Sequence, residues 1–69
     1  MKSAIGVFGD NLKKLRMSRE LSQRGLARLA KITASQVCGF ESGKSSPNLA
    51  TLKKISKALK VSLVELIGD

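Results

Sequence analysis

Two short amphipathic segments of this sequence follow each other with very few residues between them. The first covers residues 23–30 and the second residues 34–41, and each has apolar residues at helical spacing. The residues expected inside are Leu26, Ala27, Leu29 and Ala30 in the first segment, and Val37 and Phe40 in the second. Thr33 followed by Gln36 predicts a capping box at the start of the second helix. Because so short a connection forces two helices to cross steeply, the sequence predicts a helix-turn-helix.

Three further helices are predicted over about residues 6–17, 49–59 and 63–67. Besides Thr33, N-capping residues precede three of the predicted helices, and Gly43 predicts where the helix at 34–41 ends. These caps are Ser22, Asn48 and Ser62, with Glu65 completing a second capping box. The apolar residues expected inside are Phe8, Leu12, Leu15, Leu49, Leu52, Ile55, Leu59, Leu63, Leu66 and Ile67. Short helices with short connections predict an all-α, compact five-helix fold, one domain over residues 1–69.

The chemistry available to the chain is narrow, because its 69 residues include one cysteine and no histidine. A single cysteine rules out an intrachain disulfide, so the core must consist of packed aliphatic side chains. Without histidine, neither a Ser-His-Asp nor a Cys-His catalytic set can form, and most zinc sites are excluded. We therefore expect no enzyme activity, no metal, no cofactor and no small-molecule ligand.

The charge of the chain is strongly unbalanced. Thirteen Lys and Arg residues against five Asp and Glu give a formal net charge of +8. Such an excess indicates a polyanionic partner or an acidic surface. No stretch approaches the roughly 20 apolar residues that a membrane span needs, so no membrane partner is expected. The lone thiol and the lack of a targeting signal favour the reducing cytoplasm.

The residues in and around the helix-turn-helix carry a resemblance to a known family. They are Leu21-Ser22-Gln23, Leu26-Ala27, Ile32-Thr33, Val37, Glu41-Ser42-Gly43-Lys44 and Pro47, continued by Leu52, Ala58-Leu59, Val61-Ser62-Leu63 and Leu66. In these residues and their spacing, the chain resembles the lambda-repressor-like (Cro/C1, or XRE) DNA-binding family over about residues 8 to 67. The resemblance implies that the helix at 34–41 is a recognition helix that enters the major groove of double-stranded DNA.

The resemblance also implies which residues contact DNA. The residues that it assigns to phosphates are Gln23, Thr33, Lys44, Ser45 and Asn48. The residues that it assigns to base edges are Ala34, Ser35, Cys38 and Gly39. Relatives usually carry longer polar side chains at the base-reading positions, and the capping box claims Gln36. We therefore expect direct reading of bases to be thin and DNA shape to contribute more. Arg24, Arg28 and Lys2 are further candidates for contacts with DNA.

The same resemblance implies structural roles for other residues. Arg16 and Glu41 match family positions that form a buried or half-buried ion pair. Lys31 stands where relatives often have Gly, which predicts a left-handed backbone at a residue with a side chain. Gly25 replaces the usual Glu of the second helix and lowers its helix propensity. Val64 is expected to project outward into a small homodimer contact, whose rim consists of Lys60, Val61 and Glu65.

The function implied by the resemblance is transcriptional regulation in a bacterium or a phage. The simplest form is a nucleoid-associated, cytoplasmic repressor that binds a palindromic operator as a homodimer, because one motif covers too few base pairs for genomic specificity. Two alternatives stay open. One is an antitoxin or other protein-binding module that autoregulates through the same fold, and the other is a restriction–modification controller.

Overall fold

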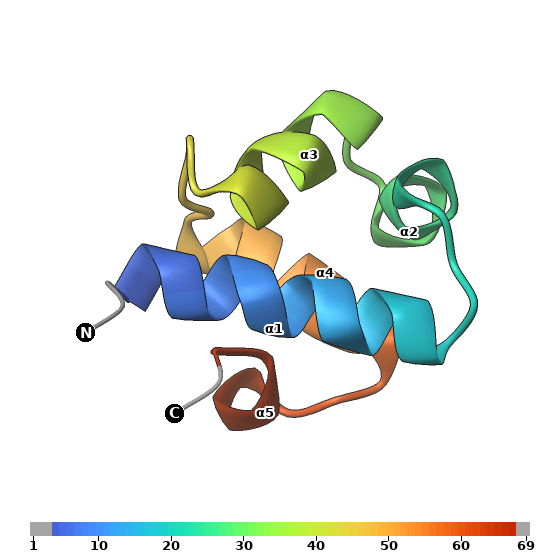
Figure 1. Ribbon diagram of the computed structural model, residues 1–69. Coiled ribbons are helices and arrows are strands. Elements are labelled where there is room, and N and C mark those ends of the chain that lie inside the picture. The colour runs from blue at the N-terminus through green and yellow to red at the C-terminus, as the bar shows by residue number, and fades with distance from the viewer. Residues whose placement is uncertain (1–3, 68–69) are drawn as a thin grey trace.

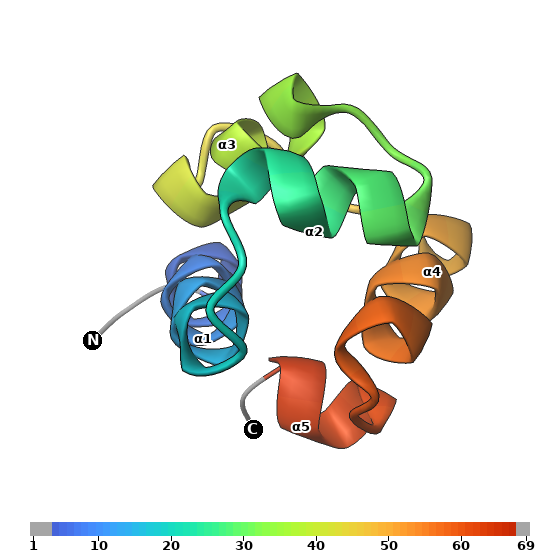
Figure 2. The same cartoon turned by 90° about the vertical axis from the view of Figure 1, so that its right-hand side faces the viewer.

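The longest helix, α1 (Ala4–Ser18), forms one side of the molecule, and the other helices face it across a shared core (Figures 1 and 2). The computed structural model describes residues 4–67, with side chains from residue 8 onward. After α1, these residues form α2 (Gln23–Ala30), α3 (Ala34–Ser42), α4 (Leu49–Leu59) and α5 (Leu63–Ile67), with no strand among them. The all-α, five-helix prediction is confirmed over this range. Helix α1 is longer than the predicted 6–17, and α3 ends one residue later than predicted.

The core contains at least one residue from every helix. The side chains that are fully buried are Leu12, Leu26, Val37, Ile55, Leu59 and Leu66. The rings of Phe8 and Phe40 join α1 to α3, with centroids 6.3 Å apart and planes tilted by 59°. Each helix is too short to be stable alone, so the helices depend on this common core.

Three leucine and isoleucine residues that the periodicity placed inside lie on the surface instead. Leu29 is 57% exposed, Leu49 is 59% exposed and Ile67 is 43% exposed, so these predictions were wrong. Leu49 is the first residue of α4, and Cα–Cβ bonds in a helix tilt toward its N-terminus, which directs this side chain away from the core. Leu29 and Ile67 lie at the edges of their apolar stripes, where no neighbouring helix covers them.

The predicted helix caps are present at the N-termini. Ser22 Oγ accepts a hydrogen bond from the Gly25 backbone N–H at 2.9 Å, and Asn48 Oδ1 accepts one from the Thr51 N–H at 2.8 Å. Ser62 Oγ accepts from the Glu65 N–H at 3.1 Å, which forms half of the predicted box. The Glu65 carboxylate contacts the Ser62 hydroxyl at 3.5 Å rather than closing the box through the backbone.

Three C-caps have a left-handed backbone. Gly43 ends α3 with φ of 80°, as predicted. Lys31 ends α2 and Lys60 ends α4, both with φ of 58°. The left-handed conformation predicted for Lys31 is therefore confirmed, while that of Lys60 was not anticipated.

A side-chain contact closes the bundle at its far end. The Asn11 amide, on α1, donates hydrogen bonds to the backbone carbonyl oxygens of Glu65 and, at 2.8 Å, of Leu66. The short helix α5 is thereby fixed against α1 on the side of the molecule away from α3 (Figure 1). Among the helices of residues 4–67, none combines the length and the apolar character that crossing a bilayer requires.

Candidate DNA interface

Helices α2 and α3 cross steeply, as the short connection predicts. Figure 1 shows α2 nearly end-on while α3 runs across the view, and Figure 2 shows α2 along its length. The left-handed Lys31 makes the sharp turn possible, and the Ile32 N–H donates back to the Ala27 carbonyl at 2.9 Å. Thr33 and Gln36 then form the complete capping box that starts α3. The helix-turn-helix prediction is confirmed in its geometry.

One face of α3 is buried and the other is open to solvent. Val37 and Phe40 point into the core, while Ser35, Gln36, Cys38 and Ser42 are exposed. Of the predicted base-reading residues, Ser35 and Cys38 thus lie on the open face. Ala34 is half-buried and packs against the core, and Gly39 is half-buried beneath the following loop. The open face of α3 carries no charged side chain, so its own chemistry is neutral.

The loop after α3 is attached to the helix through Gly39. The backbone N–H groups of Lys44 and Ser45 both donate to the Gly39 carbonyl oxygen, at 3.0 Å and 3.3 Å. A Cβ at position 39 would lie 2.6 Å from Ser45 Oγ, so glycine lets the loop lie close to the helix. This role was missed from the sequence. A glycine inside a helix lowers its stability, which is the signal that could have indicated a close approach here.

The predicted phosphate-contacting residues lie around the ends of α2, α3 and α4. Lys44 and Ser45 are exposed in the loop. Asn48 uses its side-chain oxygen as a cap, which leaves its two N–H donors free for another acceptor. Thr33 Oγ1 accepts from the Gln36 N–H at 3.0 Å and contacts Gln36 Oε1 at 3.3 Å, so the cap engages its hydroxyl. Thr33 and Asn48 are both N-caps, and a helix N-terminus attracts anions.

Gln23 belongs to a network that the sequence did not reveal in full. Its Nε2 donates to Glu41 Oε1 at 3.2 Å. Glu41 also accepts from Arg16 Nε at 2.7 Å and from Arg16 Nη2 at 3.2 Å, which confirms the predicted ion pair. Arg16 Nη1 donates to the Leu21 carbonyl oxygen at 2.7 Å. The network connects α1, the segment before α2, and α3, and it still leaves one Gln23 N–H for a phosphate.

Glu41 raises the pKa of the Arg16 guanidinium above its ordinary value, chiefly through their hydrogen bond, and partial burial opposes this effect. Because the pKa of Arg16 is higher in the folded state, the ion pair stabilises the fold fully at any pH below the pKa that Arg16 has in the unfolded chain. This stabilisation is lost only as the pH rises through the folded pKa. Because arginine is always charged under ordinary conditions, Arg16 keeps its positive charge in the network.

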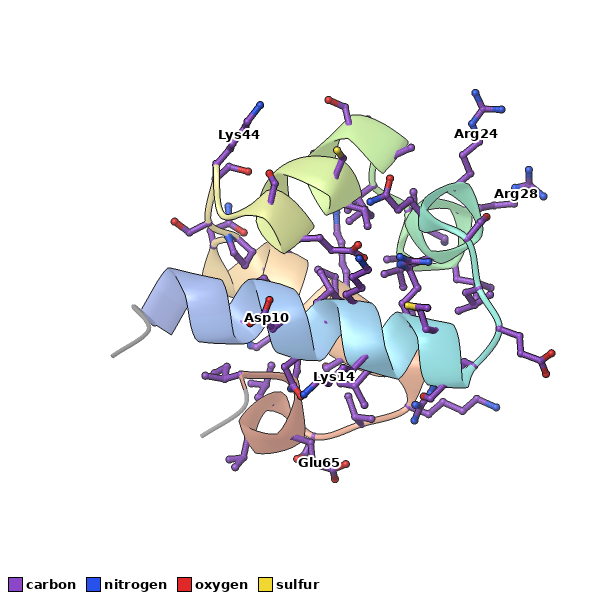
Figure 3. The ribbon with its side chains drawn as sticks, viewed as in Figure 1. Asp10, Lys14, Arg24, Arg28, Lys44 and Glu65 are labelled. Atoms are coloured by element: carbon purple, nitrogen blue, oxygen red, sulfur yellow. The ribbon has the colours of Figure 1, made fainter. Side chains whose placement is uncertain are left out.

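Cations flank the open face of α3 on both sides. Figure 3 shows Lys44 projecting at one end of α3 and Arg24 and Arg28 projecting from α2 beyond its other end. Glu65 lies on α5, on the other side of the molecule, and Asp10 lies on α1, between α3 and α5 in this view (Figure 3). Lys2 lies outside the described residues. This surface, made of the open face of α3 with Arg24, Arg28 and Lys44, is called the α3 face below.

A comparison with protein-family models decides the family. The Helix-turn-helix model HTH_3 matches residues 12–66, which is most of the chain. The chain belongs to the HTH_3 helix-turn-helix family. Among the described residues of this HTH_3 domain, no group of three or more His, Cys, Asp or Glu side chains is placed to hold a metal ion.

Named relatives of the HTH_3 domain include regulators of several kinds. It is 38% identical over 63 residues to the control protein C.MunI of Mycoplasma sp, covering 90% of this chain and 85% of that protein. It is 37% identical over 61 residues to the HTH-type transcriptional activator BcrR of Enterococcus faecalis, covering 88% of this chain and 30% of BcrR. Thus the chain spans less than a third of BcrR, and it spans 52% of another relative, a SPbeta prophage-derived regulator of Bacillus subtilis.

A solved structure has the same fold. The restriction–modification controller protein C.AhdI from Aeromonas hydrophila superposes with a TM-score of 0.87 at 35% sequence identity. The match covers 90% of this chain and 94% of that chain. The lambda-repressor-like resemblance seen in the sequence is therefore confirmed at the level of family and fold.

Proposed function

We propose that this protein is a DNA-binding transcriptional regulator, and that it represses by occupying a palindromic operator as a homodimer. The observation that carries the proposal is the α3 face, where a neutral, solvent-exposed helix surface lies between Lys44 on one side and Arg24 and Arg28 on the other. An α-helix fits the major groove of B-DNA, and cations at both ends of the helix match the phosphates on the two sides of that groove. The implied place of action is the cytoplasm of a bacterium.

In this proposal, one set of residues fixes the position of the protein on DNA and another set reads the base sequence. Gln23, Thr33, Lys44, Ser45 and Asn48 bind phosphates and fix the position of α3. Ser35 and Cys38 approach base edges, with Ala34 and Gly39 beside them. Three of these residues have short side chains and Gly39 has none, so few direct hydrogen bonds to bases are expected. Close approach of the helix, bridging water and sequence-dependent DNA shape supply the remaining specificity.

The homodimer contact is proposed at α5. Val64 is 66% exposed and Ile67 is 43% exposed, which leaves two apolar side chains of one short helix uncovered. Lys60 and Glu65 are exposed around them, while Val61 is half-buried against the core. A twofold axis would bring the two apolar patches together and place Lys60 near Glu65 of the other subunit. So small a contact is below the roughly 1,200 Å² of stable complexes, so dimers should form mainly on DNA.

The proposal is tested by selecting bound sequences from random duplexes and measuring the affinity of the purified protein for them. The expected result is a twofold-symmetric consensus with half-sites about one helical turn apart, bound tightly in low salt and more weakly as salt rises. Retention of random duplexes without enrichment of any consensus would contradict sequence-specific regulation. A stable complex with a second protein that excludes duplex DNA would favour the antitoxin alternative.

A restriction–modification controller is the second candidate. It is favoured by one observation, because the two named controller proteins match this chain over 85% and 94% of their own lengths. The same selection experiment distinguishes it from other regulators once its consensus is compared with the DNA flanking this protein's own gene. A consensus that lies upstream of a restriction enzyme gene supports the controller function, and its absence there contradicts it.

A further inference from the structure

A groove of about 420 Å³ lies between the C-terminal ends of α2 and α4. Its apolar residues are Leu29, Ala30 and Ala58, and its basic residues are Lys31, Lys54, Lys57 and Lys60. We call it the α2–α4 groove. The two helices that form it approach each other at one edge of the molecule in Figure 2. The exposed Leu29 that the sequence analysis placed in the core is therefore part of an apolar surface that stays open.

Two of the four lysines occupy backbone positions that do not suit them. Lys31 and Lys60 are the C-caps of α2 and α4, and both have φ of 58°. Glycine adopts this conformation without strain, whereas a residue with a Cβ destabilises the fold when it does so. Of the three described non-glycine residues with a positive φ, Lys31 and Lys60 line the groove and Glu20 does not.

The charges around the groove are not neutralised within the described part of the chain. Over residues 4–67, none of the four lysine ammonium groups has a carboxylate within ion-pair distance, and all four lysines are exposed. The groove has an apolar floor, with Leu29 partly in water, and four unpaired positive charges around it. These features indicate the chemistry of the ligand that would fit it. That ligand is an apolar side chain flanked by carboxylates.

We propose that the α2–α4 groove binds an acidic, amphipathic segment of another protein, whose apolar side chains contact Leu29 and Ala58 and whose carboxylates face the lysines. A second copy of this chain is a poor occupant, because it carries +8 and only five acidic residues. A small anionic ligand is also a poor occupant. Small-molecule sites bury most of their ligand, whereas Leu29 is 57% exposed and shows that the groove is shallow.

The α2–α4 groove is separate from the proposed DNA contacts. None of the residues proposed to contact DNA lines the groove, although Arg28 of the α3 face lies in the last turn of α2, next to Leu29. DNA phosphates gain nothing from contact with the apolar floor, so we assign the groove to a protein partner. The groove shares Lys60 with the rim of the proposed homodimer contact. The present proposal goes beyond DNA binding and does not depend on it.

The test uses a synthetic helical peptide about 14 residues long, or four helical turns, with leucines on one face and glutamates elsewhere. It is titrated without DNA into the isotopically labelled protein, and amide shifts are followed by NMR. The expected result is saturable shifts confined to α2 and α4 around the groove. A peptide of the same composition, with its leucines distributed over all faces, should bind at least about tenfold more weakly because it presents no apolar stripe.

Matched variants locate the binding. Leu29→Ala should weaken peptide binding about tenfold, whereas Leu49→Ala, which removes an equally exposed leucine outside the groove, should leave it unchanged. Lys54→Glu with Lys57→Glu should weaken it more than Lys13→Glu with Lys14→Glu, which changes the net charge equally on α1. All four lysines are exposed, so these variants should fold, and thermal unfolding checks this.

Three results would overturn the proposal. The first is equal binding of the two peptides. The second is an equal loss of peptide binding in the α1 charge variant or in Leu49→Ala. The third is a loss of DNA affinity in the Lys54→Glu and Lys57→Glu variant that matches the loss in Lys44→Ala and exceeds that of the α1 charge variant, because the groove would then belong to the DNA surface.

Discussion

Arg16 holds the carboxylate of Glu41 through two parallel hydrogen bonds, and both side chains are almost out of water, with exposures of 11% and 6%. The pair joins α1 to the last turn of α3, the helix proposed to enter DNA. Glu41 also accepts a hydrogen bond from Gln23, a proposed phosphate contact. The ion pair therefore links the position of α3 to the orientation of Gln23, the side chain that we propose contacts a phosphate.

Replacing Glu41 by Gln should destabilise the fold by about 3 kcal/mol, because it leaves the nearly buried Arg16 charge facing a neutral amide. Urea unfolding measures the change in the free energy of unfolding. Glu20→Gln removes the same charge from an exposed carboxylate and should change stability by less than about 0.5 kcal/mol. Equal effects of the two substitutions would show that the buried pair has no special role.

Gly9→Ala and Gly25→Ala should change stability in opposite directions. A Cβ on Gly9 would lie 2.7 Å from the Phe40 carbonyl oxygen and 2.8 Å from that of Glu41, so α1 and α3 must separate, at a cost of about 1–3 kcal/mol. A Cβ on Gly25 would meet Ser22 Oγ at 3.3 Å, an atom that can move slightly. There the gain in helix propensity, up to about 1 kcal/mol, should prevail. Thermal unfolding of the two variants checks both signs.

Lys44→Ala should weaken binding to all duplex sequences and reduce the slope of log affinity against log salt by about 0.9, the value for one lost phosphate contact. Fluorescence anisotropy titrations over a range of salt concentrations measure the slope. Lys14→Ala removes an equal charge from a lysine on the side of α1 toward α5 (Figure 3), and it should leave the slope unchanged. A slope that is the same in Lys44→Ala as in the wild type would argue against the contact.

Ser35→Ala should alter base preference at one or two positions of each half-site, with a discrimination loss near the low end of about 1–3 kcal/mol. Ser35 is exposed on the α3 face, and its hydroxyl can both donate to and accept from a base edge. Repeating the selection of bound duplexes with the variant measures the preference. Ser46→Ala, an exposed serine in the loop, serves as the control. An unchanged consensus for Ser35→Ala would mean that Ser35 does not read bases directly.

Val64→Asp should abolish cooperative binding to a full palindromic site while leaving half-site affinity and stability unchanged. The reason is that Val64 is 66% exposed, so an aspartate there costs little in the monomer but places two like charges at a twofold axis. Titrations of half-site and full-site duplexes measure cooperativity, and analytical ultracentrifugation measures the dimer. Full cooperativity in the variant would show that the dimer interface does not include α5.

The helix starts and the turn of this fold could be predicted from sequence because they depend on local chemistry. Ser22, Thr33 and Asn48 cap the helices that follow them through hydrogen bonds spanning three residues. Such contacts are encoded within one turn of chain. The same is true of Gly43, whose left-handed backbone ends α3.

The misplaced residues depend on distant parts of the chain. Periodicity identified the apolar stripe of α2, but whether Leu29 is covered depends on where α4 lies. In the same way, no pattern near Gln23 reveals that its amide reaches Glu41, eighteen residues away. Helical phase and the family resemblance assigned Ala34 and Gly39 to base edges, but neither reveals the core beneath Ala34 or the loop over Gly39.

The double hydrogen bond from the loop to the Gly39 carbonyl has a consequence for the speed of association. Because Lys44 and Ser45 are already fixed to α3 by their backbone N–H groups, the loop needs little ordering when DNA arrives. The conformational entropy of that loop is lost during folding rather than during binding. Encounter with DNA should then lead to a bound complex at a rate set by diffusion and electrostatic steering, with no slow rearrangement of the protein after contact.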